Sequence, residues 1–350
     1  MKLFYKCLLF YLIVFLARAQ NDTPTNIILL IGDGMGLTQI TSGMYANGNK
    51  TILENFENIG LAKTHSFKNL ITDSAASGTA IACGEKTYNG VLGINHKNKS
   101  IPSIINYCSS YGYKTALLST SSIIHATPAS FYSNVDSRNE YENIALQLLQ
   151  SDVDYFIGGG KKYFTKRKDK KNILVDNNPY FMVDNLKDFS VSESDKVGYL
   201  TYEKEPPKKS QGRTPSLPKM LSTLLDRFNE QNVPFFVMAE GSQIDWGGHA
   251  NNTSYVISEF DEFEESIQIA YNFAIKNKNT LVIITADHET GGMTLSGGDI
   301  SKKMVKCKFN TRGHSATMVP VFAYGPFSEK FRGIYENTAI FHKMKTAVSE

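Results

Sequence analysis

The sequence predicts an α/β fold, a three-layer sandwich in which helices flank a large, mostly parallel central sheet. Two observations predict it: short, continuous apolar runs recur along the chain, and amphipathic helical segments separate them. Continuous apolar runs are typical of strands buried on both faces, as in parallel sheets. The 350 residues are 41% hydrophobic and 20% charged, so the chain can bury such a sheet between two helical layers.

Five apolar runs are predicted to be strands, at residues 26–31, 114–119, 233–238, 280–285 and 319–324. Acidic residues closely follow three of them: Asp33 after the first, Glu240 after the third and Asp287 after the fourth. Ligands of open α/β sheets bind beyond the carboxyl ends of the strands. We therefore expect these three carboxylates to meet at one edge of the sheet.

The clearest predicted helix covers about residues 254–276. Its apolar residues recur at spacings of three and four and form one stripe, made of Val256, Phe260, Phe263, Ile267, Ala270 and Ala274. Acidic residues flank the stripe, and we interpret them as a solvated helix face; they are Asp261, Glu262, Glu264 and Glu265. A shorter helix-like stretch, residues 101–111, precedes the second predicted strand.

The first nineteen residues have the organisation of a secretory signal peptide. Lys2 and Lys6 precede the apolar run at residues 7–16, and Ala17-Arg18-Ala19 provides a cleavage site of the small-x-small type. A membrane anchor is the alternative, but ten apolar residues are too few to span a bilayer, and no later segment is long and apolar enough. We expect an exported protein, periplasmic or secreted.

Removal of this segment also removes the slight basic excess of the chain. Residues 1–19 carry three basic and no acidic residues, so the formal net charge falls from +3 to zero, which gives no argument for nucleic-acid binding. We expect residues 20–350 to form one domain with a polar, basic insert at about 161–216. The insert is interpreted as a solvated excursion; a patch that attracts anionic substrates is the alternative.

The cysteines exclude two kinds of site. Cys83, Cys108 and Cys307 remain after removal of the signal peptide, and no C-x-x-C pair occurs. The sequence therefore contains neither a zinc ribbon nor a thioredoxin-like redox motif. Two of the three could form a disulfide in an oxidising compartment, and buried free thiols are the other interpretation.

Several carboxylate and imidazole side chains have the types and spacings of metal ligands. They are Asp33, Asp245, His249, Asp287, His288 and His314. Mixed carboxylate and imidazole ligands suit zinc, and carboxylates with hydroxyls suit magnesium. Each piece alone has an ordinary alternative, such as a surface ion pair or a Gly-Asp-Gly turn. Their joint occurrence at several strand ends predicts a metal centre.

Ser74 is the candidate nucleophile. Small residues follow it, in Ser74-Ala75-Ala76-Ser77-Gly78, at what reads as the start of a helix. Backbone N–H groups at such a position can hold phosphate oxygens, aided by the helix dipole. An N-cap serine in a tightly packed helix is the alternative. The sequence has no Gly-x-Ser-x-Gly elbow, so an esterase triad is not indicated.

Four segments together resemble the signature segments of the alkaline phosphatase family, in the family's order. They are Gly32-Asp33-Gly34-Met35-Gly36, Thr72-Asp73-Ser74-Ala75-Ala76-Ser77-Gly78, Thr285-Ala286-Asp287-His288-Glu289 and Gly313-His314-Ser315. The resemblance covers about residues 26–345 and is closest to the compact bacterial, cold-adapted type. It implies a single phosphatase domain, a homodimer, and hydrolysis of a broad range of phosphate monoesters through a phosphorylated serine.

The resemblance also implies a role for each matching residue. Ser74 matches the phosphorylated nucleophile, and Arg138 matches the arginine that grips phosphate. Two Zn²⁺ and one Mg²⁺ are implied per chain. The implied ligands are Asp245, His249 and His314 for the first zinc, Asp33, Asp287 and His288 for the second zinc, and Asp33, Thr127 and Glu240 for magnesium.

Two positions depart from the enterobacterial pattern of the family. His125 stands where those enzymes have aspartate, and Trp246 stands where they have lysine. We expect both side chains to lie on the substrate side of the site. They leave the implied zinc ligands intact, but an imidazole beside the third site weakens its preference for magnesium.

Two other functions remain open from the sequence. A phosphodiesterase of the same superfamily shares most of the implied metal ligands. A non-catalytic phosphate-binding protein on the same scaffold is a second alternative. A sulfatase is excluded, because the segment at Ser74 lacks the C/S-x-P-x-R pattern of that group.

Overall fold

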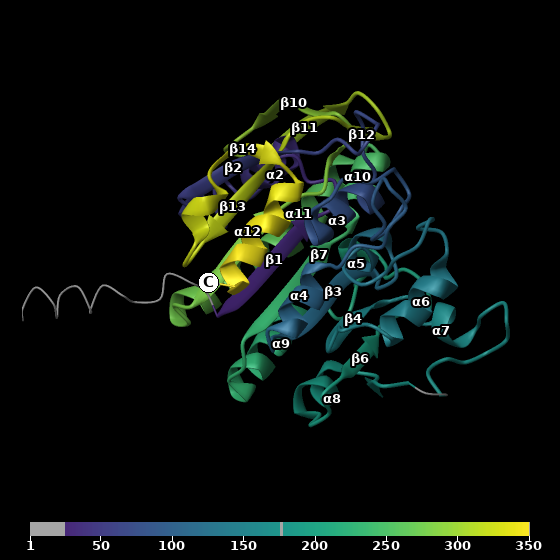
Figure 1. Cartoon of the computed structure of the whole chain (residues 1–350). Coiled ribbons are helices and arrows are strands. Elements are labelled where there is room, and N and C mark those ends of the chain that lie inside the picture. The colour runs from purple at the N-terminus through teal and green to yellow at the C-terminus, as the bar shows by residue number, and fades with distance from the viewer. Residues whose placement is uncertain (1–24, 176–177, 350) are drawn as a thin grey trace, which may run out of the picture.

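The computed structural model describes residues 25–175 and 178–349. The predicted signal peptide at residues 1–19 lies outside this range. Ten strands form one central sheet (Figure 1), namely β1 (Asn26–Gly32), β2 (Asn58–Lys63), β3 (Lys114–Ser122), β4 (Tyr155–Gly159), β5 (Phe181–Val183), β6 (Val197–Leu200), β7 (Phe235–Gly241), β8 (Thr280–Thr285), β13 (Val319–Tyr324) and β14 (Gly333–Glu336). All five predicted strands are therefore confirmed, with ends shifted by up to three residues.

The sheet is mostly parallel, as predicted. Its strand order is β14-β2-β13-β8-β1-β7-β3-β4-β6-β5, and only β13 runs antiparallel to its neighbours. The first strand, β1, lies in the middle between β7 and β8, and every one of its side chains is buried. Short strands form two small ladders beyond the sheet, namely β10 (Met293–Asp299) with β11 (Met304–Phe309) and β9 (Glu289–Thr290) with β12 (His314–Ser315).

Helices cover both faces of the sheet and complete the three layers (Figure 1). One layer contains α2 (Leu37–Ala46), α9 (Leu217–Gln231) and α11 (Thr253–Lys276). The other contains α3 (Ser74–Cys83), α4 (Ile104–Ser110), α5 (Ala126–Ala129) and α12 (Thr338–Ser349). The remaining α-helices of the described residues are α6 (Tyr141–Leu149), α7 (Lys162–Thr165), α8 (Leu186–Val191) and α10 (Gln243–His249).

The longest helix, α11, confirms the predicted apolar stripe but corrects the interpretation of its acidic residues. All six stripe residues are buried. Glu262, however, is also buried, and with Glu259 it binds the buried guanidinium of Arg213 at 3.0 and 2.5 Å. Glu264 is also buried and accepts a hydrogen bond from the backbone N–H of Ile52 at 3.0 Å. An amphipathic pattern cannot reveal these partners, because they come from distant segments of the chain.

Residues 161–216 contain regular elements. The strands β5 and β6 extend one end of the central sheet, and α8 packs on them. Phe189 and Val197 from this segment are fully buried in the main core. Its lysine-rich start is exposed and includes ion pairs such as Lys166 with Glu203 at 2.8 Å.

Cys83 and Cys108 are buried free thiols and Cys307 is a partly exposed one, so the described residues contain no disulfide. Burial raises the pKa of the Cys83 and Cys108 thiols, which keeps them protonated and unreactive. Across residues 25–175 and 178–349, every helix is too short or too polar to cross a bilayer.

Candidate metal centre and nucleophile

The register of the central strands places the predicted carboxylates together. Ile31 of β1 pairs with Glu240 of β7 on one side and with Thr285 of β8 on the other. Asp33 and Asp287 each lie two residues beyond this level, at the carboxyl ends of their strands. Three segments that are far apart in the sequence therefore deliver their acidic side chains to one edge of the sheet, as predicted.

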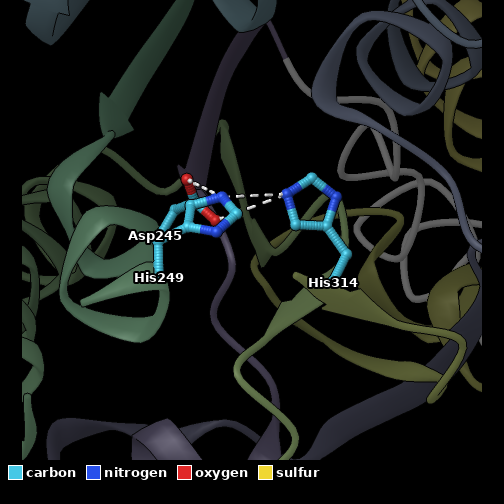
Figure 2. A group of neighbouring side chains, drawn as sticks. All are labelled: Asp245, His249 and His314. Atoms are coloured by element: carbon cyan, nitrogen blue, oxygen red, sulfur yellow. Dashed lines mark hydrogen bonds and ion pairs between the residues drawn. The ribbon is translucent and has the colours of Figure 1, made fainter. Parts of the chain in front are cut away.

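The first candidate ligand group is Asp245, His249 and His314, shown in Figure 2. Asp245 and His249 lie one turn apart on α10, so both side chains emerge on the same face. Nε2 of His249 lies 3.3 Å from Asp245 Oδ2, and Nε2 of His314 lies 3.7 Å from Asp245 Oδ1. The two Nε2 atoms are 3.2 Å apart. Both imidazoles therefore turn the same nitrogen toward one point.

The outer ring nitrogens explain this orientation. Nδ1 of His249 lies 2.5 Å from the carbonyl oxygen of Arg312, and Nδ1 of His314 lies 2.8 Å from that of Thr72. A carbonyl can only accept a hydrogen bond, so each Nδ1 carries the proton. Each Nε2 is then the ring nitrogen turned to the interior, which is how metal-binding histidines are usually held. Its contact with Asp245 raises the pKa of His249 to about 9, so a bound metal would displace a proton from this Nε2.

The second candidate group surrounds His288, which is fully buried. Its Nε2 atom lies 3.2 Å from Asp287 Oδ2, 3.5 Å from Asp33 Oδ1 and 3.3 Å from the hydroxyl oxygen of Ser74. Asp245 also belongs to this group, with Asp33 and His288, so its carboxylate is shared by the two candidate ligand groups. The predicted nucleophile and the second predicted ligand set thus occupy one place.

The third candidate group is Asp33, His125 and Glu240. Glu240 Oε2 accepts hydrogen bonds from the hydroxyls of Ser119 and Ser242, both at 2.7 Å. The other oxygen, Oε1, is buried and accepts none. Glu240 is thus held from one side and presents a free oxygen on the other.

Trp246 lies beside the third group. Its ring meets the ring of His125 edge-on, with centroids 6.1 Å apart. Both side chains are partly exposed, unlike the fully buried carboxylates behind them. They therefore form part of the solvent-facing side of the centre.

Buried polar atoms without partners show that the centre fits cations. Both carboxylate oxygens of Asp33, Oε1 of Glu240, Nδ1 of His125 and Oγ1 of Thr127 are buried and make no hydrogen bond. Leaving such groups unpaired in a protein interior is costly. These carboxylate, hydroxyl and imidazole atoms are the ligand types that zinc and magnesium take, so the residues present fit both ions.

In the protein without cations, the pKa values of the buried carboxylates are raised, because ionised carboxylates would be buried close together. Burial, followed by repulsion from Asp287 and Asp245, raises the pKa of Asp33 well above its ordinary value. Burial raises the pKa of Asp287 to about 6 and that of Glu240 to about 7. It lowers the pKa of His288 to about 3, so this imidazole stays neutral and able to bind a metal.

These shifts predict how metal binding depends on pH. Without cations, the folded-state pKa values of Asp287 and Glu240 lie above the ordinary carboxyl value near 4. The metal-free fold therefore loses stability as the pH rises from about 4 through 6 and 7. A bound cation removes this loss, because it requires the ionised carboxylates.

We expect the difference in Tm between the metal-loaded and metal-free protein to widen from pH 5 to pH 8. Apparent zinc affinity should rise about tenfold per pH unit for each proton released. Thermal unfolding of both forms at matched ionic strength checks this. His125 and His288 are neutral in both forms over this range, because burial lowers both pKa values to about 3, so they cancel in the difference. His249 does not cancel: Asp245 raises its pKa to about 9 in the metal-free protein, so its proton must leave on metal binding and the difference widens in the same direction. A difference independent of pH would contradict the assignment.

Ser74 is the first residue of α3 and is only 3% exposed. The preceding residue, Asp73, caps this helix by accepting a hydrogen bond from the backbone N–H of Ala76 at 3.0 Å. The N-cap therefore belongs to Asp73, which leaves the Ser74 hydroxyl free to face His288. Small residues follow because α3 is buried along its whole length, and a Cβ on Gly78 would lie 2.6 Å from Ser130 Oγ.

Asp73 also positions Arg138. Its Oδ2 atom binds Nη1 of the arginine at 3.0 Å, next to the candidate nucleophile. Burial raises the pKa of Asp73, but Arg138 and the backbone donors of Ala76 and Gly90 outweigh it, so the carboxylate remains ionised. The Arg138 side chain is about one-quarter exposed, and its remaining donors can turn toward a phosphate.

All twelve sequence-predicted site residues thus lie at one edge of the sheet or directly beside it. The sequence did not reveal several further residues that hold these side chains in place. Asp73 belongs to the quoted signature, yet only its contact with Arg138 reveals its second role. Ser119 and Ser242, which hold Glu240, carry no sequence signal.

Gly34 has φ of +69°, and a Cβ there would lie 2.8 Å from the Cα of Asp245. A Gly-Asp-Gly turn predicts the first property but not the close approach of two site loops.

The comparisons with known proteins agree with this geometry. The family model described as alkaline phosphatase matches residues 24–308 and 299–349. Alkaline phosphatase 4 of Bacillus subtilis is 32% identical, over 94% of this chain and 91% of its own length. The Escherichia coli alkaline phosphatase is 28% identical, over 95% and 88%.

Solved structures support the same relation. The alkaline phosphatase from the Antarctic bacterium TAB5 is 43% identical and superimposes with a TM-score of 0.88, over 93% of this chain and 98% of that one. The cold-active enzyme from a Shewanella species is 26% identical with a TM-score of 0.84, over 93% and 100%. The expected resemblance to the compact, cold-adapted bacterial type is thereby confirmed. This chain belongs to the alkaline phosphatase family and is a metal-dependent enzyme that hydrolyses phosphate monoesters.

Proposed function

We propose that the reaction proceeds through a covalent phosphate ester of Ser74. The observation that carries this proposal is the position of its hydroxyl oxygen, buried at the start of α3 and 3.3 Å from His288 Nε2. In the first step Ser74 Oγ bonds to phosphorus while the bond to the leaving oxygen breaks. In the second step water attacks the phosphoserine, Ser74 Oγ departs, and inorganic phosphate is released.

We propose two Zn²⁺ and one Mg²⁺ per chain, as the resemblance implies. Asp245, His249 and His314 would hold the first zinc, with Asp33, Asp287 and His288 for the second, and Asp33, Thr127 and Glu240 for magnesium. The imidazole-rich sets suit zinc, and the carboxylates with a hydroxyl suit magnesium. When bound, such ions would act as Lewis acids that stabilise both the attacking and the leaving oxygen of an in-line displacement.

Protein groups would align the phosphate for this attack. Arg138, held by Asp73, offers a planar fork that can bind two nonbridging oxygens at once. The first turn of α3 points its positive end toward the same place. Few contacts would reach the leaving group, which supports a broad substrate range.

His125 and Trp246 are proposed to border the substrate and the third cation. The partly exposed edge-on pair they form supports this place. An imidazole next to the third group weakens its preference for magnesium. Variants of the TAB5 enzyme in which a histidine was replaced by aspartate or glutamate carry Mg in the site named M3. By this analogy, the third group of this chain, which has an imidazole at His125, would bind magnesium more weakly than a group with a carboxylate in that place.

Substitution of Arg138 tests whether this site hydrolyses phosphate monoesters with the arginine bound to the phosphate. We expect Arg138→Ala to lower kcat/KM for p-nitrophenyl phosphate about 10²–10³-fold, because a charge-assisted bidentate contact to the transition state is lost. Arg138→Lys should recover only part of this loss, since an ammonium cannot bind two oxygens in one plane. Steady-state rates at saturating zinc and magnesium provide the measurement.

Arg167→Ala is the matched control. Arg167 also pairs with a carboxylate, Asp169, but lies in the basic segment that follows α7. Its guanidinium also donates to the carbonyl of Glu142 at 2.6 Å, and it touches none of the candidate ligands. We therefore expect Arg167→Ala to keep kcat/KM within about twofold, with any loss appearing in Tm instead. The same assay with bis-p-nitrophenyl phosphate distinguishes the phosphodiesterase alternative. A wild-type protein that turns over the diester faster than the monoester would overturn the monoester assignment of this site.

We further propose export, on the signal-peptide pattern of residues 1–19. A homodimer is proposed on the family resemblance alone. Residues 20–350 are proposed to act as one catalytic domain, and the packing of β5, β6 and α8 against the main core supports this.

A further inference from the structure

Thr290 has no role in the reaction as described above, yet it touches residues of both zinc groups. It is fully buried and lies two residues after His288, in β9. Its backbone is fixed on both sides: the N–H donates to Gly34 O at 3.2 Å, and the carbonyl accepts from Gln39 Nε2 at 2.8 Å. In the β9–β12 ladder it is also the direct partner of His314.

The side chain of Thr290 makes two further contacts with the predicted ligands. Its hydroxyl donates to Oδ1 of Asp245 at 2.5 Å. The same oxygen lies 3.2 Å from Nδ1 of His288. One hydroxyl thus stands between a carboxylate of the first zinc group and an imidazole of the second.

The number of protons decides the direction of these two bonds. A threonine hydroxyl has one proton, and an ionised carboxylate can only accept. Because that proton goes to Asp245, the contact with His288 is a hydrogen bond only if Nδ1 of the imidazole carries a proton and donates it. Nε2 of His288 is then unprotonated, on the side that faces Ser74, Asp33 and Asp287.

This arrangement differs from that of the other two histidines. Nδ1 of His249 and of His314 each faces a carbonyl oxygen, which fixes the proton without help. A hydroxyl can donate as well as accept, so alone it would leave the tautomer of His288 undecided. Here the tautomer is decided only because Asp245 takes the hydroxyl proton.

We propose that Thr290 is a positioning residue that couples the two zinc groups, its hydroxyl orienting Asp245 while fixing the metal-binding tautomer of His288. The inference rests on the proposed zinc ligands. Its consequence is that loss of this one hydroxyl weakens both zinc sites together, although Thr290 binds neither ion.

The test compares Thr290→Val, which keeps the shape and removes the hydroxyl, with Thr290→Ser, which keeps the hydroxyl. Zinc binding to the full chain is measured by competition with a chelator of known affinity. We expect the valine variant to bind both zinc ions about 10–100-fold more weakly, the usual effect of losing a hydrogen bond to a metal ligand. The serine variant should stay within about threefold of wild type.

Thr115→Val is the matched control. Thr115 is equally buried and also donates a hydrogen bond, to Asp152 O at 2.6 Å, but it lies at the opposite end of its strand from the centre. Loss of the Thr115 hydroxyl should lower Tm without changing zinc affinity. Wild-type zinc affinity in Thr290→Val, or equal losses in the valine and serine variants, would overturn the inference.

A second measurement does not depend on the variants folding. In the zinc-loaded wild type, long-range ¹H–¹⁵N spectra of labelled histidine should show the His288 proton on Nδ1 and the metal on Nε2. The reverse arrangement would overturn the inference. If the proposed zinc sites themselves were wrong, the wild type would bind no zinc, and this result is distinguishable from a failure of the role proposed for Thr290.

Discussion

Replacement of Ser74 by alanine is expected to lower kcat by about three to six orders of magnitude. The variant loses the oxygen that would bond to phosphorus, and loss of a covalent nucleophile in hydrolases has effects of this size. The fold should persist, because Asp73, not Ser74, caps α3. Zinc content should stay near that of the wild type, since carboxylates and imidazoles supply the other ligands. Single-turnover rates and acid-quenched labelling with ³²P-phosphate provide the measurements.

Ser42→Ala is the matched control for this variant. Ser42 is fully buried and its hydroxyl bonds within α2, to Gln39 O at 2.8 Å, without touching any ligand of the centre. We expect its turnover to match the wild type. In wild type the acid-stable label should map to Ser74, and in Ser74→Ala it should disappear. Wild-type turnover by fully metallated Ser74→Ala would refute the covalent route.

Removal of the metals is the second change with a large expected effect. Exhaustive chelation should lower activity by at least about a thousandfold, because the cations would stabilise both oxygens of the displacement. Without them, the buried carboxylates of Asp33, Glu240 and Asp287 repel one another, and the distant charge of Arg138 offsets this only in part. Zinc should restore most of the activity, and magnesium should add to it.

The order of reconstitution makes this experiment specific. Zinc alone, magnesium alone and both together are added to the same demetallated sample, and bound metal is counted against rate. Two zinc ions per chain should accompany the main recovery. Full turnover by protein shown to be free of metal would end the metal assignment, and recovery by magnesium alone would invert the roles proposed for the three groups. Chelator already saturated with zinc serves as the control for direct inhibition.

The sequence was sufficient for the fold and the general place of the site. Continuous apolar runs predicted the central strands, and their period and length distinguished them from helices such as α11. The acidic residues at strand ends predicted the edge of the sheet at which the centre lies, because parallel strands point their carboxyl ends the same way. These inferences depend only on local pattern, which a single sequence contains.

The side-chain contacts of the site could not be predicted from local sequence patterns. The ion pair of Asp73 with Arg138 and the burial of Glu262 against Arg213 join residues separated by 65 and 49 positions, and neither partner has a local signal. For this reason the prediction of a solvated face was wrong for Glu262 and Glu264, whereas Glu265 is exposed as predicted. An acidic residue next to an apolar stripe is ordinarily solvated, unless a distant cation is folded onto it.

By itself, the sequence determined the secondary elements, the parallel sheet and the identities of the side chains at its carboxyl edge, since these follow from hydrophobic period and residue type. Only the tertiary structure decided which oxygen and nitrogen atoms face one another. The tautomers of the three histidines, the free oxygens of Asp33 and Glu240, and the hydroxyl of Thr290 between the zinc groups all depend on atoms brought within about 3 Å by distant strands. Hydrogen bonds and metal ligation act only at such distances.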